Sequence, residues 1–157
     1  TRQENDRIVL QNIVSREGGL KACLAPSSCY TLDTVTNVVL SDKSLNKYVM
    51  GLLNSRLANF FTIIVTFLHS NFTMHADKAY IGAIPIVIPT AKQKSIIEDI
   101  IERLSAMEND REGYWDAYQR LNSELFKLYE LSESEVSLIE RTLSSIMSVK
   151  SNGRTDE

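Results

Sequence analysis

The chain has 157 residues, of which 43% are hydrophobic and 24% charged, and it contains six glycines and three prolines. This composition excludes a low-complexity or disordered chain, and the length allows a substantial buried core. The net charge of −3 is unevenly distributed: residues 1–96 carry ten basic and six acidic residues (+4), whereas residues 97–157 carry seven and fourteen (−7). If the chain contacts nucleic acid, the basic surplus therefore assigns that contact to the first part.

The longest apolar stretch, residues 57–68, is shorter than the roughly 20 residues that cross a bilayer, so we expect a core segment and no membrane contact. No signal peptide is recognisable and the chain opens at Thr1 without Met, which favours a cytoplasmic piece of a longer protein. Cys23 and Cys29 form no CxxC pair. We therefore expect two buried thiols and no zinc, with a disulfide as the lesser alternative.

Short strands are predicted first along the chain. Residues 7–14 and 21–24 are apolar or β-branched, and the turn-forming residues 16–19 separate them. Residues 30–40 are rich in Thr and Val, which predicts either a pair of strands or one long bent strand.

A central helix is predicted next. Ser41 or Asp42 can cap it, and apolar residues with three- and four-residue spacing continue to about Phe61. Residues 62–68 are equally apolar but β-branched. They either extend the helix or begin a buried strand, and periodicity does not decide between the two.

Residues 70–77 are polar and short-chained, which predicts an exposed loop. In residues 83–89, isoleucines alternate with prolines. Proline lacks the backbone N–H that a helix or a central strand requires, so this stretch is expected to be an edge strand or an extended segment on the surface.

Two capping boxes mark the helices that follow. Thr90 with Gln93 opens residues 90–128, whose apolar residues form a heptad-like seam and predict a long helix or helical hairpin that packs on a partner helix. Ser132 with Glu135 opens the final helix.

The predicted fold class is therefore α+β: a small mixed β-sheet domain with a central helix, followed by long C-terminal helices. We place a first domain at residues 1–89, which the resemblance described below implies to be a DNA target recognition domain, a helical arm or docking segment at residues 90–150 and a disordered tail at residues 151–157.

Known catalytic patterns are absent from the sequence. It contains no GxGxxG, GxxxxGK[ST] or HExxH motif, and neither histidine has ligands at metal spacing, so we predict no catalytic residue and no metal site. Lysines that can neutralise phosphates and short polar side chains that can bond to bases remain. Each of these alone is more often ordinary surface polarity. The candidate DNA-binding residues are Lys21, Tyr30, Thr31, Thr34, Lys43, Ser70, Asn71, Thr73, His75 and Lys78.

Three segments taken in order resemble a known family. Residues 52–60 (LLNSRLANF) are similar to the LLNS-(K/R)-L-x-N-(F/Y) helix of the TaqI-like C-terminal specificity domains of Type II restriction-modification DNA methyltransferases. Residues 80–94 resemble their Ile-Pro segment, and residues 125–136 (LFKLYELSESEV) resemble their V-Y-x-LYGL-(T/S)-x-x-E-I ending. Residues 30–34 are similar to the family's GYYT loop, although Cys29 stands where a glycine is usual.

This resemblance implies a target recognition domain without catalysis of its own. Its partners would be double-stranded DNA and an N-terminal methyltransferase domain that methylates adenine at N6. S-adenosylmethionine would bind in that domain, so no cofactor is expected in this chain. A homodimer through residues 90–128 is a further possibility. Two alternatives stay open: half of a Type I specificity subunit, and a helical interaction or dimerisation module.

Overall fold

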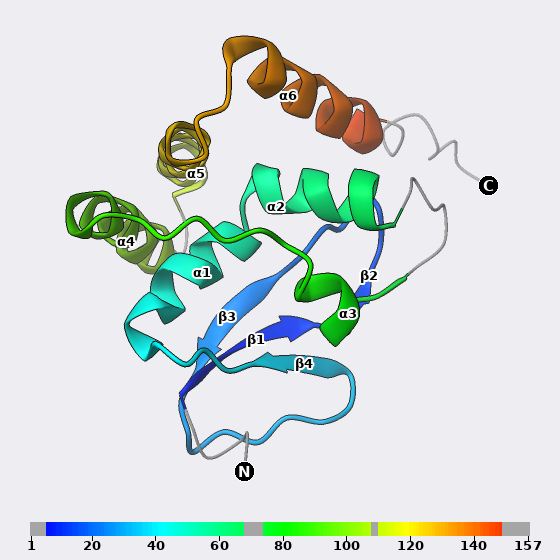
Figure 1. Cartoon of the computed structure of the whole chain (residues 1–157), viewed down its shortest axis with the longest axis vertical. Coiled ribbons are helices and arrows are strands. Elements are labelled where there is room, and N and C mark those ends of the chain that lie inside the picture. Colours follow the sequence, from blue (N-terminus) through cyan, green and yellow to red (C-terminus); the bar gives the residue numbers. More distant parts are fainter. Residues whose placement is uncertain (1–5, 68–73, 108–109, 149–157) are drawn as a thin grey trace.

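The computed structural model describes residues 6–67, 74–107 and 110–148 (Figure 1). The strands are β1 (Arg7–Gln11), β2 (Ile13–Val14), β3 (Ala22–Ala25), β4 (Val35–Val38) and β5 (Met74–His75). The helices are α1 (Asn46–Leu53), α2 (Arg56–Phe60), α3 (Lys78–Ile81), α4 (Ala91–Ala106), α5 (Arg111–Leu128) and α6 (Glu133–Ser148). Small antiparallel sheets precede long C-terminal helices, so the predicted α+β class is confirmed.

The main sheet has the order β3-β1-β4, and β1 is antiparallel to both neighbours. Val9 in its centre lies opposite Cys23 on one side and Asn37 on the other. β3 and β4 are therefore parallel to each other, and residues 26–34 cross from the end of one to the start of the other. A second, two-stranded sheet pairs β2 with β5, with Ile13 opposite His75.

The main core joins this sheet to the helices. Because side chains alternate along a strand, Ile8 and Leu10 of β1 point together toward the helices and are buried there. In Figure 1 the sheet lies at the bottom, α1 and α2 above it, the α4–α5 pair to the left and α6 at the top. The core residues that α4 and α5 contribute are Ile97, Ile100, Ile101, Leu121, Leu125 and Leu128.

Residues 30–40 were predicted to form a pair of strands or one long bent strand. They contain one strand of four residues, β4. The preceding loop is held by Arg7, whose side chain is fully buried. Its guanidinium donates to the side-chain oxygen of Asn37 (2.6 Å) and to the backbone oxygens of Pro26 (3.3 Å) and Cys29 (2.5 Å). These bonds bind the loop against the sheet, so residues 26–34 do not extend the ladder.

The central helix is interrupted rather than continuous to Phe61. Asp42 accepts a hydrogen bond from the Ser44 N–H (2.9 Å), which confirms one of the two predicted caps, although the first turn, Lys43–Leu45, is a 3₁₀-helix. The hydroxyl of Ser55 then caps a second start at α2 by accepting from the Ala58 N–H (3.2 Å). A π-helix at Phe61–Thr66 follows, so this part of residues 62–68 extends the helix and forms no strand.

The predicted loop at residues 70–77 is wrong at its end, where Met74–His75 forms β5 and Asp77 caps α3. The Ile-Pro stretch is extended and has no strand partner. Two tyrosines hold it: the Tyr48 hydroxyl donates to the Val87 oxygen (2.7 Å), and the Tyr129 hydroxyl donates to the Pro85 oxygen (2.7 Å) and accepts from the Val87 N–H (3.3 Å).

Both predicted capping boxes are present. Thr90 and Gln93 bond reciprocally at the start of α4, and Ser132 and Glu135 do the same before α6. Residues 90–128 form a hairpin of two helices, which selects one of the two predicted arrangements. A second cluster attaches α6, and its members are Ile63, Phe126, Ile139, Leu143 and Ile146.

Both cysteines are exposed and carry free thiols, so the prediction of buried thiols is wrong. Cys29 lies in the crossing loop and Cys23 on β3. Among the described residues, no single helix is long and apolar enough to span a membrane; Lys43–Leu53 and Arg56–Thr66 reach those limits of length and composition only together, across a bend of 65°. The tail predicted at residues 151–157 lies outside the described residues.

Candidate nucleic-acid interface

Asn12 lies between β1 and β2 and joins three segments of the chain. Its N–H donates to the Thr34 oxygen (3.1 Å), and its backbone oxygen accepts from the Ala76 N–H (2.6 Å). Its side-chain oxygen bonds to Nδ1 of His75 (2.7 Å). The crossing loop and β5 are therefore fixed to each other through one residue.

Three of the predicted DNA-binding residues bond to Asn12 or to its neighbour Gln11. Thr34 and His75 bond to Asn12 directly, and the N–H of Gln11 donates to the Lys21 oxygen (3.1 Å). Lys78 follows His75 by three residues, at the start of α3. We call this group the Asn12 end of the sheet; its members are Asn12, Lys21, Thr34, His75 and Lys78. All except Asn12 are exposed.

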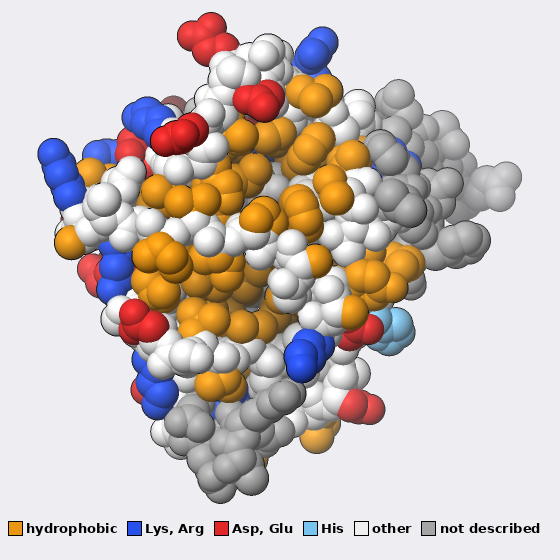
Figure 2. Space-filling model, in the orientation of Figure 1, with side chains coloured by type: hydrophobic (Ala, Val, Ile, Leu, Met, Phe, Trp, Pro, Cys, Tyr) orange, Lys and Arg blue, Asp and Glu red, His pale blue; other side chains and the backbone are white. Residues whose placement is uncertain are grey.

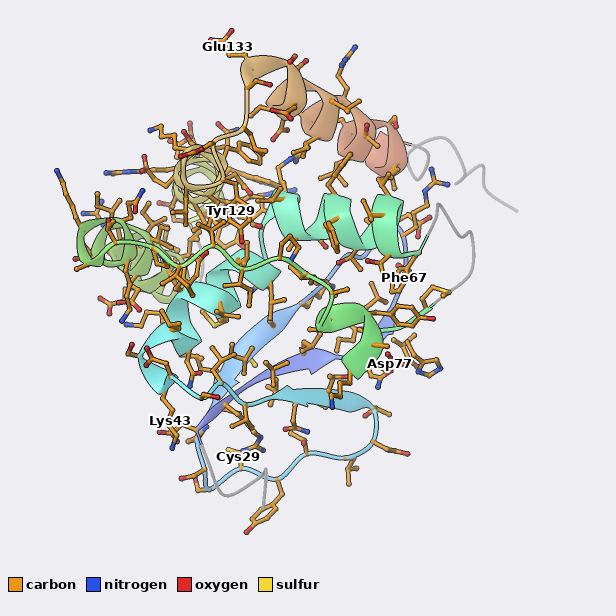
Figure 3. All side chains as sticks on the ribbon, in the orientation of Figure 1. Cys29, Lys43, Phe67, Asp77, Tyr129 and Glu133 are labelled. Carbon is orange, nitrogen blue, oxygen red and sulfur yellow. The ribbon has the colours of Figure 1, made fainter. Side chains whose placement is uncertain are left out.

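The remaining candidates are not part of this group. Tyr30 is 76% exposed on the crossing loop, and the hydroxyl of its neighbour Thr31 accepts from the Asn37 amide (2.8 Å). Lys43 follows the far end of β4, and Figure 3 shows Lys43 and Asp77 at opposite ends of the sheet. Three further candidates lie outside the described residues, namely Ser70, Asn71 and Thr73.

The chemistry of the Asn12 end suits a nucleic acid. Lys21 and Lys78 supply cations for phosphates, while Thr34 and His75 supply hydrogen-bonding groups that can reach bases or backbone. The carboxylate of Asp77 is turned to the start of α3, where it accepts from the Ala79 N–H (3.0 Å). Within the described ranges, no group of three His, Cys, Asp or Glu side chains is arranged to hold a metal ion.

Asn12 was missed as a site residue by the sequence analysis. The available signal was weak: an asparagine interrupts an otherwise apolar run at residues 7–14, which marks a possible break in a strand. Its partners His75 and Thr34 are distant in sequence, and only the fold brings them together.

The residues that carry the family resemblance hold the fold together. In the segment LLNSRLANF, the Asn54 side chain accepts from the Ala22 N–H (2.9 Å) and donates to the Ala22 oxygen (2.8 Å). Asn59 accepts from the Leu20 N–H (2.6 Å), and Arg56 pairs with Glu140 of α6 (2.8 Å). These residues attach β3 and α6 to the central helices.

A groove between residues 16–23 and the first half of α5 was also not predicted. The α5 side of the groove is lined by Tyr114, Trp115 and Tyr118. The rings of Trp115 and Tyr118 pack edge to face, with their centroids 5.7 Å apart. The Tyr118 hydroxyl donates to the Asn54 oxygen (3.1 Å), and burial raises the pKa of Tyr118. Tyr118 therefore stays protonated near neutral pH and acts as a structural donor.

Comparison with known proteins identifies one class of protein that has a similar fold. No protein-family model and no curated protein matches the chain. Among solved structures, the fold is similar to part of a restriction-modification enzyme.

That enzyme is MmeI, of Type IIL, in complex with DNA. The two chains superpose with a TM-score of 0.66 and 14% sequence identity, over 94% of this chain and 22% of MmeI. The present chain thus spans about a fifth of that protein's length, and at this identity the likeness establishes the fold.

Proposed function

We propose that the chain is the DNA target recognition module of a restriction-modification methyltransferase and holds duplex DNA for a catalytic domain elsewhere. The observation that carries the proposal is the likeness of 94% of the chain to part of an enzyme whose structure was solved with DNA. In this proposal the catalytic domain binds S-adenosylmethionine and methylates adenine at N6. The present module is cytoplasmic and needs no cofactor.

The Asn12 end of the sheet is the proposed contact surface. Lys21 and Lys78 would neutralise phosphates and fix the register, and Thr34 and His75 would bond to base edges. The crossing loop with Tyr30 and Thr31 borders this surface through Thr34. Ser70, Asn71 and Thr73 precede β5, and they remain candidates on the strength of the sequence alone.

A different face is proposed to receive the catalytic domain. Figure 2 shows hydrophobic side chains gathered on the face that residues 82–90 cross, with charged side chains mainly around its edge. Ile86, Val87 and Ile88 are exposed there by 42%, 38% and 67%. An apolar centre with a polar rim suits a protein partner and not a polyanion. MmeI is far longer than the matched segment, which supports a partner within the same enzyme.

The helical interaction or dimerisation module is the less favoured function. Its main support in the sequence was the heptad-like seam along residues 90–128. Ile97, Ile100, Leu121 and Leu125 of that seam are buried in the core of this chain, so they are not available to a second copy.

The proposal is tested by titrating the whole chain against duplex DNA at several salt concentrations. The logarithm of the affinity should fall linearly with the logarithm of the salt concentration. Lys21→Ala and Lys78→Ala should each weaken binding to all sequences and reduce that slope by about one. Lys127→Ala, which removes an exposed lysine from α5, is the matched control and should leave both quantities unchanged. A wild-type chain with no salt-dependent affinity for duplex DNA would contradict the proposal.

A further inference from the structure

His75 and Asn12 together define which nitrogen of the imidazole carries the hydrogen. Nδ1 of His75 lies 2.7 Å from the side-chain oxygen of Asn12. With the amide oxygen of Asn12 turned to the ring, Nδ1 is the donor, because an amide oxygen only accepts hydrogen bonds. In the neutral imidazole the other nitrogen, Nε2, is then an acceptor.

The fold keeps this pair in place from both sides. The backbone of Asn12 is bonded to Thr34 and Ala76, and His75 is paired with Ile13 in the two-stranded sheet of β2 and β5. The ring of His75 is anchored through Nδ1. His75 is exposed, so the ring that carries Nε2 reaches the surface. The ring is thus oriented before any ligand arrives.

The major groove of DNA admits a two-stranded β-ribbon, and β2 with β5 is such a ribbon. The bases offer only two hydrogen-bond donors in that groove, the exocyclic amino groups at N6 of adenine and N4 of cytosine. Guanine and thymine present acceptors there, as does every phosphate. An acceptor at Nε2 therefore favours an amino group and disfavours the alternatives.

We propose that His75 reads the exocyclic amino group of an adenine or a cytosine through Nε2, and that Asn12 is the positioning residue that sets its tautomer. This inference rests on the proposed DNA-reading function. Lys21 and Lys78 would contact phosphates, and His75 contributes discrimination at one base pair.

The test selects bound duplexes from a random-sequence pool at pH 8 with the whole chain. The wild-type chain should enrich a motif that includes one position restricted to an amino-bearing base, preferred by about tenfold. His75→Ala and Asn12→Ala should each lose the preference at that position and keep the others. The double variant should lose no more than either single variant, because the two residues act as a unit. Lys127→Ala, which removes an exposed lysine from α5, should keep every preference.

Modified bases then distinguish the two sources of the amino group. Purine in place of adenine removes the N6 amino group, and 2-pyrimidinone in place of cytosine removes the N4 amino group. The substitution that matches the enriched base should lower wild-type affinity about tenfold and leave the affinity of His75→Ala unchanged.

Nitrogen NMR of the His75 ring supplies a readout that is independent of DNA. The free wild-type chain should show a protonated Nδ1 and a bare Nε2 at pH 8, and Asn12→Ala should shift the ring toward the other tautomer. Retention of every base preference by His75→Ala, or a ring protonated at Nε2 in the wild type, would overturn this inference while leaving the proposed function intact. A wild-type chain that enriches no sequence would overturn both.

Discussion

The side-chain amide of Asn54 takes the place of a neighbouring strand at the outer edge of β3. It accepts from the N–H of Ala22 and donates to the oxygen of the same residue, as a paired strand would. It also donates to the Met50 oxygen (2.9 Å), which fixes the amide at the end of α1. The edge of the sheet is thereby bonded to the point where the central helix breaks.

Asn54→Ala should therefore lower the free energy of unfolding by about 2–3 kcal/mol, because it leaves both polar groups of Ala22 without that partner. Urea unfolding at pH 7 measures the change. Gln119→Ala removes an exposed amide from α5 and should change the free energy by less than about 0.5 kcal/mol. Equal stability of the two variants would show that the Asn54 amide does not hold the edge of β3.

Two adjacent glycines in the turn before β3 make a second residue-scale prediction. Gly19 has a φ of +60°, and a Cβ there would lie 2.4 Å from the side-chain oxygen of Asn59, which accepts from Leu20. Gly19→Ala should cost about 1–2 kcal/mol in backbone strain alone and more as Asn59 is displaced. Gly18→Ala meets only the flexible Ser15 hydroxyl at 2.9 Å and is the matched control. The melting temperature of Gly19→Ala should be well below that of Gly18→Ala, and the reverse order would refute the strain argument.

Among the elements, those set by neighbouring residues were the most predictable from the sequence. A capping box needs only two residues three positions apart, and both predicted boxes were confirmed at Thr90 and Ser132. The break of the central helix at Ser55 was missed, because apolar residues continue with helical spacing across it. The crossing loop was missed as well, since Arg7 holds it from 19 and 22 residues away.

The second capping box makes the attachment of α6 depend on pH. Hydrogen bonds from the hydroxyl and N–H of Ser132 hold the pKa of Glu135 below its ordinary value of 4.5. A carboxyl group with a lowered pKa in the folded state stabilises the fold above its unfolded pKa. That contribution is lost as the pH falls through the lower, folded value.

Glu135→Gln should consequently destabilise the chain at pH 7 and have progressively less effect below about pH 4.5, because the contribution of the wild-type carboxyl is lost between that unfolded value and its lower, folded pKa. Urea unfolding of both proteins across this range measures the difference. Glu133→Gln removes the same charge two residues earlier without touching the bonds to Ser132, and it should show a smaller loss at pH 7. A Glu135→Gln deficit that persists unchanged at pH 3 would contradict the role of the ionised cap.

At the scale of the whole molecule, the candidate residues could be named from the sequence, but their positions relative to one another could not. Lys21, Thr34, His75 and Lys78 were all candidates, but Asn12, which joins two of them, was not. His75 and Asn12 are 63 residues apart, and no local pattern connects them. Lys43 was an equally good candidate by composition, and the order of the strands places it at the other end of β4.

The main core also crosses the domain boundary predicted at residues 89 and 90. Of the six core residues that α4 and α5 contribute, five are less than 5% exposed, and they share one cluster with Ile8 and Leu10 of the sheet. At about 1.5–3 kcal/mol for each buried side chain, their burial contributes roughly 10 kcal/mol. This is as large as the whole stability of a typical domain, about 5–15 kcal/mol. These five residues are Ile97, Ile100, Ile101, Leu121 and Leu125.

A fragment of residues 1–89 should therefore lack a cooperative unfolding transition, because the face of the sheet that bears Ile8 and Leu10 loses its cover. Circular dichroism during urea unfolding, with amide NMR dispersion at pH 7, measures this. The control is a chain ending at residue 130, which removes α6 but keeps the main core, and it should unfold cooperatively at a lower urea concentration than the whole chain. A fragment of residues 1–89 with a native-like spectrum would instead establish the helical arm as a separate unit, and the Asn12 end of the sheet could then be studied without it.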